Sequence, residues 1–181
     1  LYRTLGYPMP LFAHLPIILG HDRSKLSKRH GATSVLAYQR MGYLPDAMLN
    51  FLALLGWSLD DHTEFIPCDK LIRHFSLERI GASPAIFNEE KLTWLNGVYI
   101  RQLSTEKLAE VLTPVIETSL PHTSPRPLDW SYLMRIVPLV QERLKTLSEA
   151  PNLTSFFFTD SVEYNPATLI QRKADRAACI H

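Results

Sequence analysis

Apolar positions divide the chain into a short N-terminal run and a longer region with helical spacing. Residues 11–19, LFAHLPIIL, are almost continuously apolar and end at Gly20, as is typical of a buried strand in a parallel sheet. Pro16 weakens this prediction because proline cannot donate to a strand ladder. We expect a strand here and a loop after it, so the first thirty or so residues look α/β.

Helical patterns begin after this loop. Thr33 or Ser34 can cap the first helix, and Gly42 can end it. Pro45 suits the first turn of a second helix, whose apolar residues cover most of its circumference, so we expect it to be buried on nearly all sides. Asn88 is a candidate N-cap for a later one. The four helices predicted here lie at 35–42, 45–56, 68–77 and 88–103.

The second half of the chain reads as all-α. Ser104 can cap a helix with an amphipathic face, and the proline-rich stretch 121–127 interrupts the pattern. Asp129 then caps a long helix whose apolar stripe reaches Leu147. A last helix is expected from Asn165 to about Cys179. The predicted fold class is therefore mainly α.

Composition indicates a globular protein without a strong overall charge. The chain has 181 residues, 46% hydrophobic and 20% charged, with a net charge of about +1. Affinity for nucleic acid would have to come from local clusters of charge. No apolar run approaches a membrane span, and Cys68 and Cys179 read as free thiols in a reducing compartment. Because the chain starts at Leu1, we expect a fragment of something longer.

One short segment concentrates positive charge. Residues 20–31, GHDRSKLSKRHG, are bounded by glycines and contain a single acid, Asp22. Lysines among small residues can approach a phosphate closely, although a solvated run of charge is the simpler interpretation. The P-loop pattern GxxxxGK[ST] is absent. The four cations are Arg23, Lys25, Lys28 and Arg29, and Ser24 and Ser27 lie among them.

The spelling of this segment resembles a known signature. KLSKR at 25–29 is similar to the KMSKS loop of class I aminoacyl-tRNA synthetases. The surrounding FAHLPIILGHDRSKLSKRHGATSV and GYLPDAMLNFLALLGWS resemble the bacterial glutamyl-tRNA synthetase family. So do FSLERIGASPAIFNEEKLTWLNGVYIR and, more loosely, VPLVQERLKTLSEAPNLTSFFF.

The resemblance assigns roles to the loop. Lys28 matches the second lysine of the motif, which meets the triphosphate of ATP, and Lys25 and Ser27 match the first lysine and the serine. Leu26 stands in place of methionine and Arg29 in place of the final serine. These five residues form the expected ATP site, with Lys28 and Lys25 as catalytic residues. We expect the loop to be mobile without ATP.

The implied reaction joins glutamate to ATP as glutamyl-adenylate and then transfers it to the 3′ end of tRNA. ATP with Mg²⁺ enters as substrate, no cofactor is expected to bind tightly, and no histidine cluster suggests a metal site. The HIGH-type tetrad and the glutamate-binding residues are absent from these 181 residues. We therefore expect a cytoplasmic, monomeric distal portion of the enzyme that is inactive alone.

The same resemblance predicts three regions. Residues 1–32 would be the end of a Rossmann-type catalytic domain, 33–101 a helical stem-contact domain, and 102–181 part of a helical anticodon-binding domain. The partner would be tRNA(Glu), with tRNA(Gln) left open. Trp94 and Tyr99 are more typical of core than of an RNA platform. The candidate tRNA contacts are Lys91, Arg101, Arg172, Lys173 and Arg176.

Two alternatives stay open at this point. One is a stand-alone RNA-binding module derived from a synthetase, without enzymatic activity. The other is a relative that charges glutamine tRNA or modifies a nucleoside. The predicted helices beyond Ser104 disfavour the second, because glutaminyl enzymes continue with β-barrels and the nucleoside-modifying relative lacks the helical region.

Overall fold

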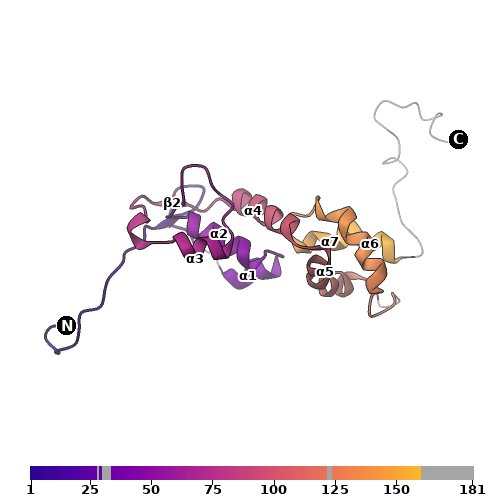
Figure 1. The fold of residues 1–181 in the computed structure, drawn as a ribbon, viewed down its shortest axis with the longest axis horizontal. Coiled ribbons are helices and arrows are strands. Elements are labelled where there is room, and N and C mark those ends of the chain that lie inside the picture. The colour runs from indigo at the N-terminus through magenta and orange to yellow at the C-terminus, as the bar shows by residue number, and fades with distance from the viewer. Residues whose placement is uncertain (28, 30–33, 122–123, 160–181) are drawn as a thin grey trace, which may run out of the picture.

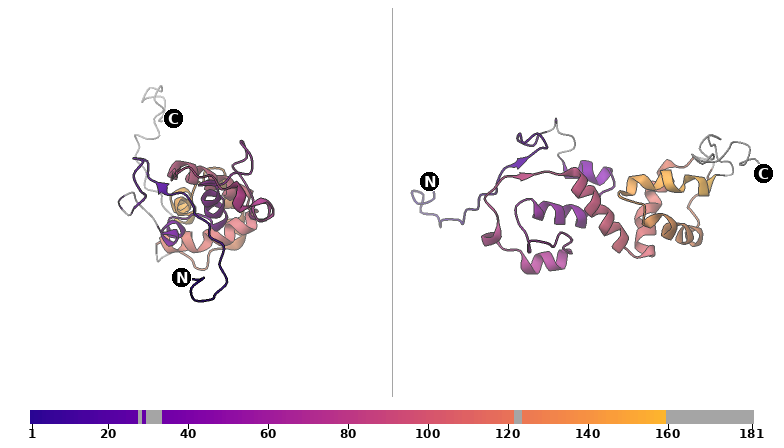
Figure 2. Two further views of the ribbon diagram at one scale, coloured as in Figure 1. Left: turned by 90° about the vertical axis from the view of Figure 1, so that its left-hand side faces the viewer. Right: turned by 90° about the horizontal axis from the view of Figure 1, so that it is seen from above.

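The computed structural model arranges the chain as two groups of helices joined by helix α4 (Figure 1). It describes residues 1–27, 29, 34–121 and 124–159. The proximal group contains α1–α3 and two short strands, and the distal group contains α5–α7 (Figures 1 and 2). The helices are α1 (Val35–Arg40), α2 (Pro45–Leu54), α3 (Cys68–His74), α4 (Glu89–Gln102), α5 (Thr105–Ser119), α6 (Trp130–Gln141) and α7 (Ala150–Thr154), with 3₁₀ turns at Leu77–Arg79, Leu147–Glu149 and Ser155–Phe158.

The predicted N-terminal strand is much shorter than its apolar run. Only β1 (Ile18–Leu19) is paired, in parallel with β2 (Ala85–Ile86), in register Ile18 to Ala85. The prediction of a strand over 11–19 is wrong because β2 offers only two residues to pair with and Pro16 cannot donate to a ladder. The N-terminal end of the chain extends away from the helices (Figures 1 and 2), and Leu11 is fully exposed, whereas Leu15 and Pro16 line a groove beside α2 and α3.

The first two helices begin where the sequence predicts and end two residues earlier, and Ser34 precedes α1 without making a side-chain cap bond. Gly42 closes α1 with a φ of +84°, a conformation that side chains other than glycine rarely adopt. Pro45 occupies the first turn of α2. The expectation that α2 is buried on nearly all sides is wrong, since Leu49 and Leu52 are 44% and 41% exposed. They face an open groove, whereas Phe51 points into the core.

Three helices are capped as predicted. The Asn88 side chain accepts the Lys91 N–H at 3.0 Å at the start of α4. Ser104 does the same for α5 at 3.2 Å. Asp129 accepts the Tyr132 N–H at 3.1 Å at the start of α6. These bonds satisfy amides that have no partner within the helix and so fix where each helix begins.

The distal group differs from its prediction after α6, where α7 was also not predicted. The stripe expected to run to Leu147 in a single helix belongs to two elements, because α6 ends at Gln141 and Leu147 opens a 3₁₀ turn. Leu144, between them, is still fully buried. The helix predicted over 165–179 lies outside the described residues. Of the helices in the described ranges, none is long and apolar enough to cross a bilayer.

A single hydrophobic core joins the two groups. Its buried residues come from α1, α2 and α4 on one side and from α5, α6 and α7 on the other. Leu95 and Ile100 of α4 are completely buried within it. A smaller cluster around Trp57, Ile66 and Leu71 lies under α3. Because α4 contributes buried residues to this core along most of its length, it packs against both groups.

Candidate functional site

The segment that contains the positive charge folds back on β1 as a tight turn. The Gly20 N–H donates to the Ser24 carbonyl at 2.9 Å, and the Arg23 N–H donates to the Gly20 carbonyl at 3.0 Å. Arg23 adopts a φ of 60°. The Asp22 carboxylate accepts both the N–H and the hydroxyl of Ser24, at 2.9 and 3.0 Å. Asp22, the single acid in this segment, therefore stabilises the turn through two hydrogen bonds.

After the turn, Lys25 and Leu26 lie beside β1. Leu19 and Lys25 form an antiparallel bridge, and the Leu26 N–H donates to the Ile18 carbonyl at 3.0 Å. Lys25 and Arg29 are exposed, and Arg29 donates to the Ser24 hydroxyl at 3.2 Å. A shallow hollow of about 590 Å³ is lined by Lys25, Leu26, Ser27 and Arg29. Lys28 lies outside the described residues.

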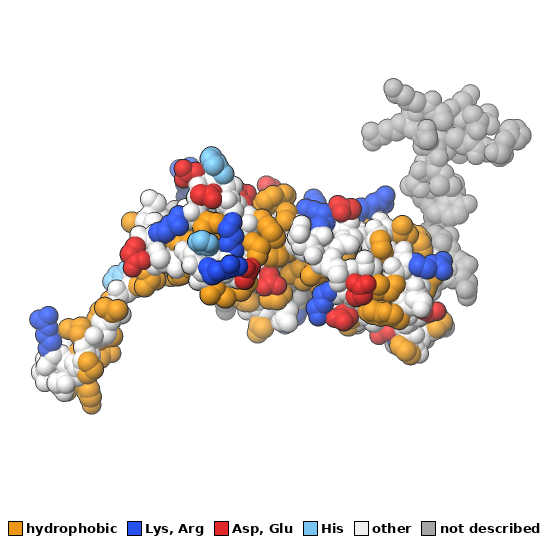
Figure 3. All heavy atoms as spheres, viewed as in Figure 1, with side chains coloured by type: hydrophobic (Ala, Val, Ile, Leu, Met, Phe, Trp, Pro, Cys, Tyr) orange, Lys and Arg blue, Asp and Glu red, His pale blue; other side chains and the backbone are white. Residues whose placement is uncertain are grey.

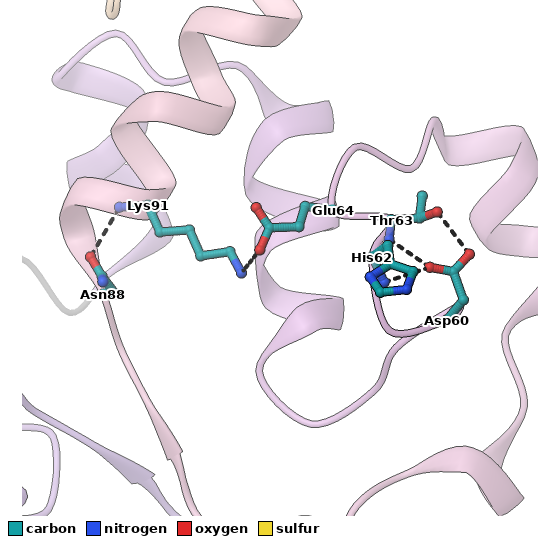
Figure 4. A network of polar contacts seen from close by, with 6 residues as sticks. All are labelled: Asp60, His62, Thr63, Glu64, Asn88 and Lys91. Carbon is teal, nitrogen blue, oxygen red and sulfur yellow. Dashed lines mark hydrogen bonds and ion pairs between the residues drawn. The ribbon is translucent and has the colours of Figure 1, made fainter.

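Lys91, one of the candidate tRNA contacts, is engaged in an ion pair. Its ammonium lies 2.6 Å from the Glu64 carboxylate, and both side chains are partly exposed (Figure 4). Glu64 follows a turn in which Asp60 accepts the His62 N–H and both the N–H and the hydroxyl of Thr63. Any contact from Lys91 to a phosphate must compete with this pair.

Arg101 lies in a polar groove that the sequence did not predict. The groove has a volume of about 700 Å³ and contains the exposed ring of Trp94. The interpretation of Trp94 as core is wrong, because its side chain is 47% exposed, whereas Tyr99 is core as expected. The lining residues are His21, Glu89, Glu90, Thr93, Trp94, Gly97, Arg101 and Lys145.

The position of each residue around helix α4 explains why Trp94 was wrongly predicted as core and how its groove with Arg101 could have been found. The buried face of α4 contains Leu92, Leu95, Tyr99 and others at helical spacing, and Trp94 lies off that face. The seven-residue spacing from Trp94 to Arg101 could have signalled that they share one surface. Lys145 had no such signal, since it reaches the groove only because the chain turns after α6.

Three of the expected tRNA contacts cannot be placed in the structure. Arg172, Lys173 and Arg176 lie outside the described residues. Within the described part of the chain, no group of three or more His, Cys, Asp or Glu side chains could hold a metal ion. Hydrophobic and charged side chains alternate over the face seen in Figure 3, without a single dominant basic patch.

Comparison with known proteins identifies the class. Residues 1–94 match the family model for tRNA synthetases class I (E and Q), catalytic domain, and residues 106–179 match that for an anticodon binding domain. The chain is therefore built like the class I aminoacyl-tRNA synthetases. Within that class, it belongs to the family specific for glutamate and glutamine. This confirms the resemblance seen in the sequence and the mainly helical fold class.

Individual relatives agree. A glutamate–tRNA ligase of Dehalococcoides mccartyi strain CBDB1 is 50% identical over 173 residues, which are 96% of this chain and 36% of that protein. One of Moorella thermoacetica is 46% identical over 90% of this chain and 34% of that protein. The crystal structure of a glutamate tRNA ligase from Elizabethkingia meningosepticum in complex with its amino acid has a TM-score of 0.75 at 28% identity and covers 92% of this chain and 36% of that one. The chain thus spans about a third of the length of these relatives.

Proposed function

We propose that this chain is the distal part of a glutamate–tRNA ligase and that residues 25–29 form its ATP loop. The observation that supports this most directly is the position of KLSKR. Its first two residues, Lys25 and Leu26, pair with the end of β1 after a tight turn, inside the region that matches the synthetase catalytic model. Exposed cations beside a shallow hollow suit a triphosphate that binds and leaves in each cycle.

The chemistry assigned to the loop is charge stabilisation. A glutamate carboxylate oxygen attacks the α-phosphorus of ATP, the bond to the β-phosphate oxygen breaks, and pyrophosphate leaves with the bonding electrons. Lys28 and Lys25 oppose the negative charge that develops on the leaving group. Mg²⁺ arrives with ATP as part of the substrate. The tRNA 3′-terminal hydroxyl then displaces AMP from the adenylate.

The test is tRNA-dependent ATP–pyrophosphate exchange by the full-length protein with glutamate. We expect Lys28→Ala to lower kcat at least about 100-fold, because one preorganised group that stabilises transition-state charge contributes on that order. Lys107→Ala is the matched control, since Lys107 is exposed and pairs with Glu110 on α5. Wild-type exchange in the Lys28 variant would remove the role proposed for the loop.

The chain alone is expected to bind RNA without catalysing exchange. The groove beside α4 combines the exposed ring of Trp94 with Arg101 and Lys145, and also contains Glu89 and Glu90, so a bound RNA would place phosphates at the two cations and a base on the ring. We propose that this groove contacts tRNA and that Lys91 does so more weakly because Glu64 holds it. ATP–pyrophosphate exchange catalysed by the isolated, monomeric chain would contradict the expectation that this chain binds RNA without catalysis.

Filter binding of a tRNA(Glu) transcript at several salt concentrations measures the groove's role. Arg101→Ala should weaken binding and reduce the salt slope by about 0.7–0.9, the change expected from one lost phosphate contact, and Lys91→Ala should change it less. Lys107→Ala again serves as the control. A parallel titration with tRNA(Gln) shows whether the protein discriminates between the two.

A further inference from the structure

The backbone of residues 144–148 passes close to two glycines, Gly42 in the turn after α1 and Gly97 in α4. A Cβ on Gly42 would come within 2.5 Å of the Ser148 nitrogen and 2.7 Å of the Leu147 nitrogen. A Cβ on Gly97, in the middle of α4, would lie 3.4 Å from the Leu144 carbonyl oxygen. Gly42 therefore leaves no room for a side chain, whereas the contact at Gly97 is an ordinary van der Waals distance, and the nearest atom there belongs to the flexible Arg101 guanidinium at 3.2 Å. We call residues 144–148 the clamped segment.

Asn96 ties this segment to the proximal group. Its side chain is completely buried. Its Oδ1 accepts the Leu44 N–H at 2.8 Å, and its Nδ2 donates to the Lys145 carbonyl at 2.6 Å. One amide therefore joins the turn before α2 to the segment after α6. Both ends of a buried amide are satisfied by backbone groups that would otherwise need other partners.

Further bonds hold the same two stretches of backbone together. The Leu147 N–H donates to the Gly42 carbonyl at 2.9 Å, and the Ser148 hydroxyl donates to the Met41 carbonyl at 2.8 Å. Gln141 adds a bond pair at the other end of α4, where its Nε2 donates to the Ile100 and Leu103 carbonyls at 3.0 and 2.9 Å.

These contacts differ from ordinary core packing because they are directional. Hydrophobic burial between α4 and its neighbours tolerates small rotations, whereas a buried amide with fixed partners allows one orientation. The contacts join the group that contains the KLSKR loop to the group that matches the anticodon-binding model. A tRNA bound by both groups would need them at one fixed angle.

We propose that Asn96 is a positioning residue that sets the angle between the proximal and distal groups, so that one tRNA engages both at once. The tRNA part of this proposal rests on the proposed function. The angle itself can be measured without RNA. If the joint loosens, the second group binds at a lower effective concentration, and affinity for the whole tRNA falls without loss of any direct contact.

The first measurement is a distance distribution by electron spin resonance between labels on the two groups. His74→Cys on α3 and Ser131→Cys on α6 supply exposed sites in a Cys68→Ser, Cys179→Ser background. We expect one narrow distance for the parent protein and a broadened distribution for Asn96→Ala. Asn50→Ala is the matched control, because Asn50 is equally buried but bonds only to Ile66 and Tyr99, away from the joint.

A second pair of variants covers the case in which Asn96→Ala does not fold. Gly42→Ala forces a side chain against the clamped segment, whereas the Cβ of Gly56→Ala meets nothing closer than 3.7 Å. Circular dichroism establishes which variants are folded. A folded Asn96→Ala or Gly42→Ala protein with the parent's narrow distance would overturn the proposal.

The second measurement is tRNA(Glu) affinity of the same proteins. Asn96→Ala should lose about 10- to 100-fold, a part of the roughly 100- to 10,000-fold gain that linked binding sites can contribute, and Asn50→Ala should keep the parent's affinity. Equal affinity losses in the two variants, or no loss in Asn96→Ala despite a broadened distance, would overturn the link to tRNA. A parent protein that binds no tRNA contradicts the proposed function, and the distance measurement then still decides whether Asn96 fixes the angle.

Discussion

At the scale of single residues, buried polar side chains fasten loops to the core. The Tyr99 hydroxyl shares its one proton between Asn50 Oδ1 at 3.0 Å and the Ile66 carbonyl at 2.9 Å, while the Ile66 N–H donates to the same Asn50 oxygen. Burial raises the pKa of Tyr99 to about 12, so the hydroxyl stays protonated in the physiological range. The loop before α3 is thereby joined to both α2 and α4.

Removing this hydroxyl tests how much the fastening stabilises the fold. We expect Tyr99→Phe to lower the free energy of unfolding by about 1–3 kcal/mol, because buried acceptors lose their donor. Tyr132→Phe is the matched control, since its hydroxyl reaches the Phe157 carbonyl in a less buried place. Urea unfolding followed by circular dichroism gives both values, and an equal loss in the two variants would argue against a special role for Tyr99.

The Asp60 turn makes a prediction about pH. The hydroxyl of Thr63, followed by the backbone N–H groups of His62 and Thr63, lowers the pKa of Asp60 from 3.8 to about 2. Because the folded pKa is the lower one, the turn is favoured above pH 3.8 and loses this advantage as pH falls through about 2. Carboxyl NMR titration should show Thr63→Val raising the pKa of Asp60. His62→Ala should change that pKa less, because its backbone N–H remains.

At the scale of elements, the two sides of α2 differ in burial and therefore in what they contribute to stability. Phe51 is 1% exposed, and Phe51→Ala should lower the free energy of unfolding by about 3–5 kcal/mol through loss of packing and a residual cavity. Leu52→Ala on the open side should cost less than about 1.5 kcal/mol. Comparable losses from thermal or urea unfolding would mean that the groove closes over Leu52 in solution.

The elements also show what the sequence alone could predict. Helix caps such as Asn88 are local chemistry and were predicted correctly, as was the stop at Gly42. Hydrophobicity does not specify which partner covers an apolar residue, so the strand over 11–19 and full burial of α2 were predicted and not observed. The joint at Asn96 depends on residues about fifty positions apart, which no local pattern connects.

At the scale of the whole molecule, an apolar groove of about 510 Å³ opens between α2, α3 and the segment before β1. Ile72 is 74% exposed within its lining and Phe75 is 45% exposed. We expect the folded chain to bind the dye ANS there, as exposed apolar surface generally does. Leu52→Gln combined with Ile72→Gln should reduce the dye fluorescence by at least about half. Leu139→Gln, an exposed position on α6, is the control.

The pairing of β1 with β2 has a consequence for the order in which the molecule assembles. Ile18 is in register with Ala85, so the strand before the turn pairs with a partner 67 positions (85 − 18) further along the chain. Closing so long a loop is entropically costly and slow compared with forming the helices in between. During synthesis β1 is made before β2 and stays unpaired until residue 86 has been added. The turn that precedes Lys25 can form locally, but its placement beside β2 follows only after that pairing.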